Sequence, residues 1–487
     1  MWRSMWIGAV SATVMAGLMP ATHAESATPV RPPGLISATT SKKKQATGIL
    51  KVVVKGNGRY WVTGTRIESS HRIYRKAFND SVIISVKPGI YAIQSDQDSD
   101  VHALTKYVTV RAGSRKTVRF RMLAAVRLSD MAYSANPLWS PDGTRMAFMG
   151  ASNSNGVGAW YVRDLRSGTV NRIADVGEWL PSSASWSPDG TKLVFAMRSP
   201  GSPGRLNYYV KDVTTGGLEL LSIDNQGKQV SSDSNGTPSW SPDGSRIAFT
   251  SGAPDLVPGD TNNAADVFVK DLRDGSTQRV STSTTGEEAN GDSGDLGLSW
   301  SPDGTRLAFV SEASNLAPGS GPRILIKNLV SGQIELMNPQ IRGKRGDRSA
   351  LMPAWSPDGT RIAFQSTVRR SDPRYPADGI YVKDLAVGKT KHVGTTDKLR
   401  GYPSWAPDSR RVAFNGSDLI VIANIDTGLR QCFPTGGGGT QDEYATWSPD
   451  GKLAVTVWRG RHSRAYVTSQ FFKGCGSFYG AKPPRWA

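Results

Sequence analysis

Acidic side chains gather in two neighbouring stretches of the sequence, and carboxylate oxygens are ligands that hard cations prefer. The first stretch, SGAPDLVPGDTNNAADVFV from Ser251, carries Asp260, Asn262 and Asp266 as candidate calcium ligands. The pattern lacks the fixed glycine and the terminal bidentate glutamate of an EF-hand loop. Asx turns alone would account for the same residues. Calcium binding and a purely structural role therefore both stay open, and no other cofactor is expected.

The other acids of the two stretches are candidates for binding a ligand. The second stretch is TTGEEANGDSGD from Thr284. The candidate binding residues of the two stretches are Asp255, Glu287, Glu288, Asp292 and Asp295. They are expected in loops, where binding residues concentrate because the scaffold holds the loops in place.

Catalytic motifs are missing from the sequence. The string GDSGD from Gly291 is similar to the surroundings of a serine-protease nucleophile, which would make Ser293 the nucleophile. The only histidines after residue 125 are His392 and His462, so few histidines are available to activate a serine. No GxSxG, HExxH or Gly-rich phosphate loop occurs, and no CxxC spacing indicates zinc. The sequence therefore predicts no catalytic residue and no enzyme.

A repeated phrase supplies the elements that must position these side chains. SWSPDGTRLAFVS from Ser299 has six further copies. The tryptophans of the seven copies are Trp139, Trp186, Trp240, Trp300, Trp355, Trp405 and Trp447. Their spacings of 47, 54, 60, 55, 50 and 42 residues match one four-stranded propeller blade each.

The chemistry of the phrase predicts a hairpin turn. Proline presets φ, aspartate bonds the local backbone, and glycine takes the positive-φ position of SPDG. A second, weaker repeat, such as VFVKDLRDG from Val267, predicts a third strand and turn, and a short fourth strand such as TQRVS follows. Seven sheets of strands A to D, arranged radially, cover one another's faces. In that topology the A–B and C–D turns share one face, and the long B–C and D–A loops share the other, which we call the loop face.

Several long loops are expected on the loop face, and we expect a binding site there. Five of them span residues 150–159, 197–207, 250–266, 311–323 and 365–379.

The repeat resembles the TolB-type, WD-like propeller repeat of extracytoplasmic bacterial proteins over residues 126–470. The carrying motifs are WSPDG followed by IAF-type strands, and then IYV-x-D-L-x-x-G. The sixth copy has Ser409 in place of glycine, and the seventh is one residue shorter after Gly451, so these blades are expected to be less regular. The predicted fold is all-β, with a seven-bladed propeller over 126–487 and a small β-sandwich before it.

The preceding segment, residues 49–122, is predicted to form alternating strands separated by glycine turns. Its V-x-P-G-x-Y-x-I run from Val86 and V-x-V-x-A-G run from Val108 resemble the PEGA-like or carboxypeptidase-regulatory-like β-sandwich. Residues 1–24 have the pattern of a cleaved signal peptide and 25–48 that of a flexible linker, which predicts an extracytoplasmic protein, periplasmic or secreted. A permanent membrane anchor would need a longer apolar run.

Charge is divided unevenly along a chain whose net charge is +18. Residues 25–125 hold 18 Lys and Arg against 6 Asp and Glu, whereas residues 126–487 hold 40 against 35. Outside the cytoplasm this excludes nucleic acid as the expected partner and favours an anionic envelope polymer or lipid headgroup, beside a simply solvated basic surface.

The two cysteines and the phrase VRLS bear on how the chain ends are fastened. An exported chain with only Cys432 and Cys475 is expected to form one disulfide. VRLS, from Val126, resembles the outer-strand phrases of the blades and is expected to complete the seventh blade.

These patterns lead to one functional interpretation and one alternative. The first is a non-catalytic binding or scaffold protein whose loop face engages a protein or an envelope polymer. The alternative is a carbohydrate-active or hydrolytic enzyme with a site in the central funnel.

Overall fold

The computed structural model describes most of the chain after residue 47. The described residues are 48–55, 60–66, 72–78, 81–86, 89–97, 105–121, 125–129, 131, 133–151, 158–177, 184–198, 206–230, 236–318, 321–337, 348–368, 379–396, 402–416, 419–434, 445–459, 462–468 and 472–473. The predicted signal peptide, and the predicted linker apart from Gly48, lie outside these residues. No helix among them is long and apolar enough to cross a membrane.

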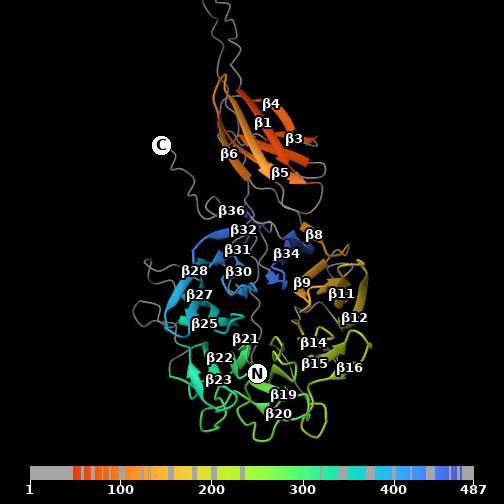
Figure 1. Cartoon of the computed structure of the whole chain (residues 1–487), viewed down its shortest axis with the longest axis vertical. Helices are drawn as coiled ribbons and strands as arrows, with labels where there is room; N and C mark the ends of the chain where they lie inside the picture. The colour runs from red at the N-terminus through yellow and green to blue at the C-terminus, as the bar shows by residue number, and fades with distance from the viewer. Residues whose placement is uncertain are drawn as a thin grey trace, which may run out of the picture. The chain divides into compact units, whose positions relative to one another are not determined.

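Seven strands near the N-terminus form two sheets (Figure 1). The three-stranded sheet has the order β4 (Ser81–Val86), β1 (Gly48–Lys55), β7 (Arg115–Arg121). The four-stranded sheet has the order β3 (Arg72–Phe78), β2 (Tyr60–Arg66), β5 (Gly89–Gln97), β6 (Thr105–Val110). Packing of the two sheets into a PEGA-like sandwich stays a prediction.

The remaining strands build an all-β, seven-bladed propeller, as the repeat predicts. Figure 1 shows the blades in succession around a ring, with β9 and β21 toward its middle and β12 and β16 at its rim. Blades 1 and 2 contain β9 (Tyr133–Trp139), β10 (Arg145–Ala151), β11 (Gly158–Asp164) and β12 (Val170–Gly177), then β13 (Ala184–Trp186), β14 (Lys192–Arg198), β15 (Leu206–Asp212) and β16 (Leu218–Leu220). Blades 3 and 4 contain β17 (Ser239–Trp240), β18 (Arg246–Ser251), β19 (Asp266–Asp271) and β20 (Thr277–Arg279), then β21 (Ser293–Trp300), β22 (Arg306–Ser311), β23 (Arg323–Asn328) and β24 (Ile334–Leu336).

The last three blades follow the same order of strands. Blade 5 contains β25 (Arg348–Trp355), β26 (Arg361–Val368), β27 (Gly379–Asp384) and β28 (Thr390–Thr395). Blade 6 contains β29 (Ser404–Trp405), β30 (Arg411–Asn415), β31 (Leu419–Asn424) and β32 (Arg430–Pro434), with β36 (Phe472–Lys473) as a fifth strand. Blade 7 contains β33 (Ala445–Trp447), β34 (Leu453–Arg459), β35 (His462–Thr468) and β8 (Ala125–Arg127).

The hydrophobic core of the propeller lies between blades. Its buried side chains form clusters that each join two adjacent blades, and the motif tryptophan of one of the two takes part in every cluster. One such cluster joins blade 7 to blade 1 through Ala454, Ala465, Trp139 and Met146. Since neither face of a blade is covered without its neighbours, apolar burial stabilises the ring rather than single sheets.

The motif also links neighbouring blades through polar contacts. The indole Nε1 of Trp300 donates to the carbonyl of Ser239 in blade 3 at 3.0 Å, and Trp186, Trp405 and Trp447 make the equivalent bond. From the other side, the Nη2 of Arg246 in blade 3 donates to the carbonyl of Gly304 in blade 4 at 2.7 Å. The repeated phrase therefore links several pairs of neighbouring blades, whereas the Nε1 atoms of Trp139, Trp240 and Trp355 are buried without a hydrogen-bond partner.

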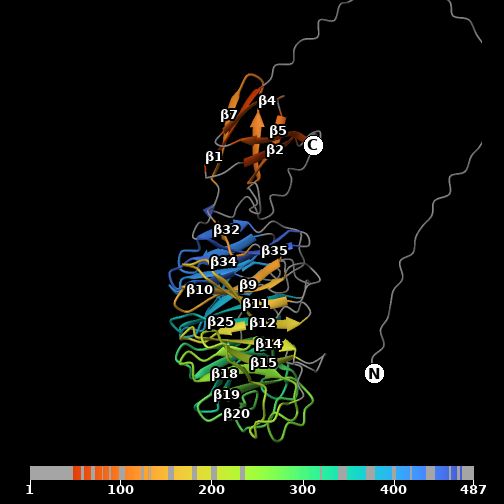
Figure 2. The ribbon, with the colours of Figure 1, turned by 90° about the vertical axis from the view of Figure 1, so that its right-hand side faces the viewer.

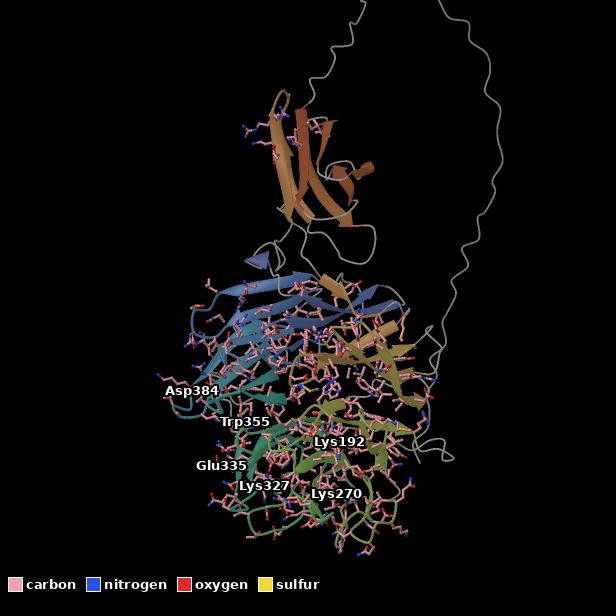
Figure 3. The ribbon with its side chains drawn as sticks, turned by 45° about the vertical axis from the view of Figure 1, so that its right-hand side comes forward. Lys192, Lys270, Lys327, Glu335, Trp355 and Asp384 are labelled. Atoms are coloured by element: carbon pink, nitrogen blue, oxygen red, sulfur yellow. The ribbon has the colours of Figure 1, made fainter. Side chains whose placement is uncertain are left out.

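A second link joins the C strand of one blade to the end of the blade before it. Lys270 and Lys327, labelled in Figure 3, lie buried on β19 and β23. The Lys327 ammonium donates to the carbonyls of Thr282 and Ser283, at 2.8 and 3.1 Å. Burial lowers the pKa of both lysines, so backbone carbonyls rather than water must solvate these ammonium groups.

The N-terminal side of the propeller closes the ring, as the VRLS phrase predicts. β8 pairs with β35 of blade 7, with Val126 opposite Val467. The amide of Leu128 donates to the carbonyl of Ala465 at 2.9 Å. Figure 2 shows β34 and β35 beside β9 and β10, and the Thr446 hydroxyl donates to the carbonyl of Pro137 in blade 1 at 2.8 Å. The outer strand of the last blade thus comes from the segment before the first, which joins the two ends of the propeller.

The two irregular copies differ from the others as their sequences predict. Ser409 adopts a φ of 55°, where the other motif turns place glycine. Its hydroxyl accepts a bond from the amide of Asp358 at 3.0 Å, which offsets part of the strain. In the seventh copy the amide of Ser448 reaches the carbonyl of Lys452, one residue earlier than in the other turns.

Cys432 is fully buried on β32, and no cysteine among the described residues is free. Cys475 lies outside the described residues, two positions after β36, which pairs with β32 through Cys432 and Phe472. The Cys432–Cys475 disulfide stays a prediction, which titration of free thiols in denatured, unreduced protein decides.

Candidate functional site

The two faces of the propeller differ as expected from the topology. The amide of Leu272, in the C–D turn of blade 3, donates to the carbonyl of Ser245, in the A–B turn, at 2.8 Å. Leu165, Val213, Leu329 and Leu385 repeat this contact in their own blades. The A–B and C–D turns therefore share one face, and the B–C and D–A loops lie at the other ends of the strands.

Three segments of the loop face bind one another around blades 3 and 4. They are residues 252–265, residues 282–292 and residues 312–318. The Asn290 amide donates to the side-chain oxygen of Asn315 at 3.0 Å, and the Asn315 side chain donates to the carbonyl of Glu288 at 2.7 Å. The amide of Glu312 donates to the carbonyl of Asp292 at 2.8 Å. Both acidic stretches of the sequence therefore belong to one ordered surface.

Two of the predicted calcium ligands, Asp260 and Asp266, lie beside an arginine together with Glu288. The Nη1 of Arg279, at the end of β20, lies 2.6 Å from a carboxylate oxygen of Glu288, 3.4 Å from one of Asp266 and 3.5 Å from one of Asp260. Asn262 donates to Asp266 at 2.9 Å. The side chain of Asp266 is inaccessible to solvent and that of Asp260 is 2% exposed.

Burial governs the protonation of this cluster. It raises the pKa of Asp260 and of Asp266, and for Asp260 the neighbouring charge of Asp266 adds to the rise. Hydrogen bonds from Thr261 lower the pKa of Glu288 instead. Among the described residues, no group of three or more His, Cys, Asp or Glu side chains is arranged to hold a metal ion. Calcium binding stays a prediction, and Arg279 supplies the cation next to these carboxylates.

A wide bulge interrupts the innermost strand of blade 4. β21 pairs with β22 at Ser293 and again from Leu298, and the residues between them leave the ladder. Gly294 and Gly297 adopt φ values of 94° and 126°, which favour glycine. A Cβ at Gly297 would lie 3.0 Å from Cδ of Pro353 in blade 5, so the site also leaves no room for a side chain. Such bulges re-aim side chains and are common beside active sites.

Asp295 lies in the middle of this bulge and is exposed to solvent. Burial of the carboxyl among surrounding protein atoms nevertheless raises its pKa, and the charges of Asp292 and Glu312 raise it further. We call Asp292, Asp295 and Glu312 the bulge site.

Tyr208 of blade 2 extends the surroundings of the bulge site. Its ring is buried, and its hydroxyl donates to the carbonyl of Gly236 at 2.8 Å. Burial raises the pKa of Tyr208, and the charge of Asp295 contributes to the rise. The phenol therefore stays protonated. The charge of the Asp295 carboxylate is one of the influences that keep it so.

The remaining candidate site residues of the sequence analysis lie at different places in the propeller. Asp255 and Glu287 are exposed on the loop face, Glu288 belongs to the Arg279 cluster, and the Asp292 carboxylate accepts the amide of Ala265 at 3.0 Å. Ser293 is buried and its hydroxyl lies 2.8 Å from that of Ser311, while His392 and His462 lie on β28 and β35 of other blades. Sequence reasoning missed Tyr208, Arg279 and Glu312.

Comparison with known proteins supports the fold. No protein-family model matches the chain. An oligogalacturonate lyase in complex with manganese is similar in structure over 73% of this chain and 94% of its own, with a TM-score of 0.53 and 16% identity. TolB from Acinetobacter baumannii matches 78% of this chain and 80% of its own, with a TM-score of 0.43 and 18% identity. The likeness to the lyase supports the propeller fold.

One curated relative is similar in sequence over a short segment. Dipeptidyl-peptidase 5 from Porphyromonas gingivalis is 27% identical over 126 residues, which is 26% of this chain and 17% of the peptidase. The chain thus spans a small part of that enzyme.

The comparisons correct the functional interpretation drawn from the sequence. A non-catalytic binding or scaffold protein was expected because the blades carry no catalytic motif. That interpretation is wrong, because the propeller fold is shared with a lyase and the matching curated relative is a peptidase. The absence of a familiar motif therefore does not separate binding from catalysis on this scaffold.

Proposed function

We propose that this chain is an extracytoplasmic enzyme that hydrolyses a neutral or cationic saccharide at the bulge site. The observation that carries the proposal is the exposed Asp295 carboxyl, whose pKa is raised beside Asp292 and Glu312. This carboxyl gives a specific reason to test for catalysis.

The arrangement supports acid–base chemistry. A carboxyl with a raised pKa retains a proton nearer to neutral pH, as a general acid requires. Asp295 would donate that proton to the leaving glycosidic oxygen as the bond to the anomeric carbon breaks. A neighbouring carboxylate would take a proton from the attacking water, whose oxygen bonds to the anomeric carbon. The charge of the remaining carboxylate would stabilise the positive charge that develops on the sugar.

The charge of the site supports the substrate class. The fold is shared with a lyase that acts on oligogalacturonate, an anionic saccharide. Asp292, Asp295 and Glu312 would repel a uronate carboxylate, whereas a neutral sugar or an amino sugar fits an acidic surface. Export from the cytoplasm, which rests on residues 1–24, and an anionic polymer as partner are likewise proposals.

Turnover of a polysaccharide panel tests the proposal. Purified protein is incubated with neutral, amino-group-bearing and galacturonate polymers, and new reducing ends are measured. We expect turnover of a neutral or amino polymer, and a loss of about 100-fold or more in kcat/KM for Asp295→Asn. Asp274→Asn, at an exposed aspartate in a C–D turn on the opposite face, is the control and should stay within twofold.

Three outcomes would overturn the proposal. The wild type turns over none of the polymers, Asp295→Asn is as active as the wild type, or only the galacturonate polymer is cleaved. Thermal unfolding of each variant shows whether a loss of turnover reflects a loss of folding.

A further inference from the structure

The three-stranded sheet near the N-terminus has one face that is rich in cations. Its register places Lys51 of β1 opposite Ile83 of β4 and Thr117 of β7. Ile83 is 56% exposed and Thr117 is exposed, whereas Val86, on the alternate set of positions, is 5% exposed. Lys116, also on the alternate set, is exposed at the start of β7. Since neighbouring positions along a strand alternate between faces, Lys51, Ile83 and Thr117 mark the solvent face of this sheet.

The positions that share this face are basic. On β7 they are Arg115, Thr117, Arg119 and Arg121, and on β1 they are Ile49, Lys51, Val53 and Lys55. Those of β4 are Ser81, Ile83 and Ser85. Five of these positions are Lys or Arg, and none is Asp or Glu. We call this set the basic sheet face.

The cations of this face have no internal partners where the structure describes them. Arg115 is exposed and Lys51 is half-buried, and neither forms an ion pair among the described residues. The exposed Arg111, in the turn between β6 and β7, lies at the same end of β7 as Arg115. The cations that the structure describes on this small sheet are thus uncompensated, in a protein whose propeller is nearly neutral.

The dimensions of the basic sheet face select the kind of partner. From Arg115 to Arg121, β7 advances about 20 Å, at about 3.3 Å per residue. The parallel neighbour β1 lies about 5 Å away, with Lys55 opposite Arg121. The positions of these cations therefore follow one another along two neighbouring strands, which matches a line of negative charges rather than a plane of them.

We propose that the basic sheet face binds a linear polyanion, such as a sulfated or phosphorylated envelope polysaccharide. This surface is separate from the bulge site and does not depend on the proposed enzymatic function. Binding would place the chain on an anionic polymer while the propeller stays free to act.

Binding of the full-length mature chain to dextran sulfate tests the proposal. Affinity is measured at several salt concentrations for the wild type and for the triple variant Lys51→Gln, Arg115→Gln, Arg119→Gln. We expect at least a tenfold weaker affinity for the variant. The slope of log affinity against log salt should fall by roughly 0.7 for each cation removed, as for single-stranded polyanions.

Two controls separate this face from net charge. The triple variant Arg166→Gln, Lys228→Gln, Lys389→Gln removes the same charge from exposed positions of the propeller and should bind within twofold of the wild type. Lys51→Arg with Arg115→Lys keeps the charge and should also bind. Equal loss in both triple variants, or no binding by the wild type, would overturn the proposal. So would binding to phosphatidylglycerol vesicles without binding to dextran sulfate, because that identifies a planar surface as the partner.

Discussion

The guanidinium carbon of Arg246 lies 5.0 Å from the ring centroid of Trp300, which belongs to the next blade. Arg145 and Trp186, Arg306 and Trp355, and Arg411 and Trp447 repeat the arrangement at 5.5, 4.6 and 4.9 Å. Four motif arginines thus cover the motif tryptophan of the following blade. Because the planar guanidinium stacks and donates at once, lysine is not its equivalent here.

The variant Arg246→Lys should reduce the free energy of unfolding by about 1 kcal/mol, because it removes both the stacking and the bond to Gly304. Chemical denaturation measures the change. Arg273→Lys is the matched control, since the Arg273 side chain is 69% exposed and pairs only with Asp271. It should change the free energy by a few tenths of a kcal/mol at most. Equal effects of the two substitutions would contradict an inter-blade role for Arg246.

Acid should weaken the motif turns. Hydrogen bonds from Ser241 and Ser245 help to lower the pKa of Asp243 to about 2. A lowered pKa contributes stability above the ordinary pKa of an unfolded aspartate, and this contribution is lost as pH falls towards about 2. Asp243→Asn should therefore destabilise the protein at pH 7, and the difference from the wild type should shrink as the pH approaches 2. Urea unfolding at a series of pH values measures it, and a difference that grows in acid would refute this role.

The closure of the ring should depend on the segment before the first blade. Leu128 is 1% exposed in the cluster that joins blades 7 and 1. Leu128→Ala should cost about 2 to 4 kcal/mol of unfolding free energy, because it leaves a cavity between two blades. Leu218→Ala, on the outer strand β16 where Leu218 is 45% exposed, serves as the control and should cost far less. A small effect at Leu128 would mean that β8 adds little to blade 7.

The repeat made much of the fold predictable from sequence. The tryptophan spacing and SPDG turns specified the blades and their two faces, and VRLS predicted the strand that completes blade 7. A basic residue occurs six positions after six of the seven tryptophans, for example Arg246 after Trp240, and this was an unused signal for the inter-blade stacking. Only the contact itself shows that the arginine reaches the next blade.

The candidate site was less accessible to sequence reasoning. Asp295 was identified as a binding residue, but its setting depends on the bulge that Gly294 and Gly297 permit. Tyr208 comes from another blade, and Arg279 ends an outer strand whose phrase, TQRVS, resembles the other outer strands. Because these residues meet only through tertiary packing, no local pattern predicts that they act together.

Substitution of Arg279 should destabilise the protein, because its acidic neighbours would lose their positive counter-charge. Arg279→Gln leaves the buried carboxylates of Asp260 and Asp266 without their cation, and should cost about 3 kcal/mol at pH 7. The raised pKa values of both groups mean that acid neutralises them readily, so the cost should fall as the pH decreases towards 4. A cost that does not vary with pH would contradict this electrostatic explanation.

The same variant tests calcium binding. A calcium ion held by Asp260, Asn262 and Asp266 would compete with the Arg279 guanidinium. Calorimetry on chelated protein should therefore show tighter calcium binding by Arg279→Gln than by the wild type, and weaker binding when Asp266→Asn is added. A flat titration for every variant would end the calcium prediction.

The central claim is that Asp295 holds a proton at a pH where ordinary aspartates have lost theirs. Carbon-13 NMR of aspartate-labelled protein measures this directly, with Asp295→Asn assigning the signal. The carboxyl of Asp295 should titrate above the ordinary aspartate pKa, and its pKa should fall when Asp292→Asn and Glu312→Gln remove the neighbouring charges. A titration at or below the ordinary value, unchanged in that double variant, would contradict the claim.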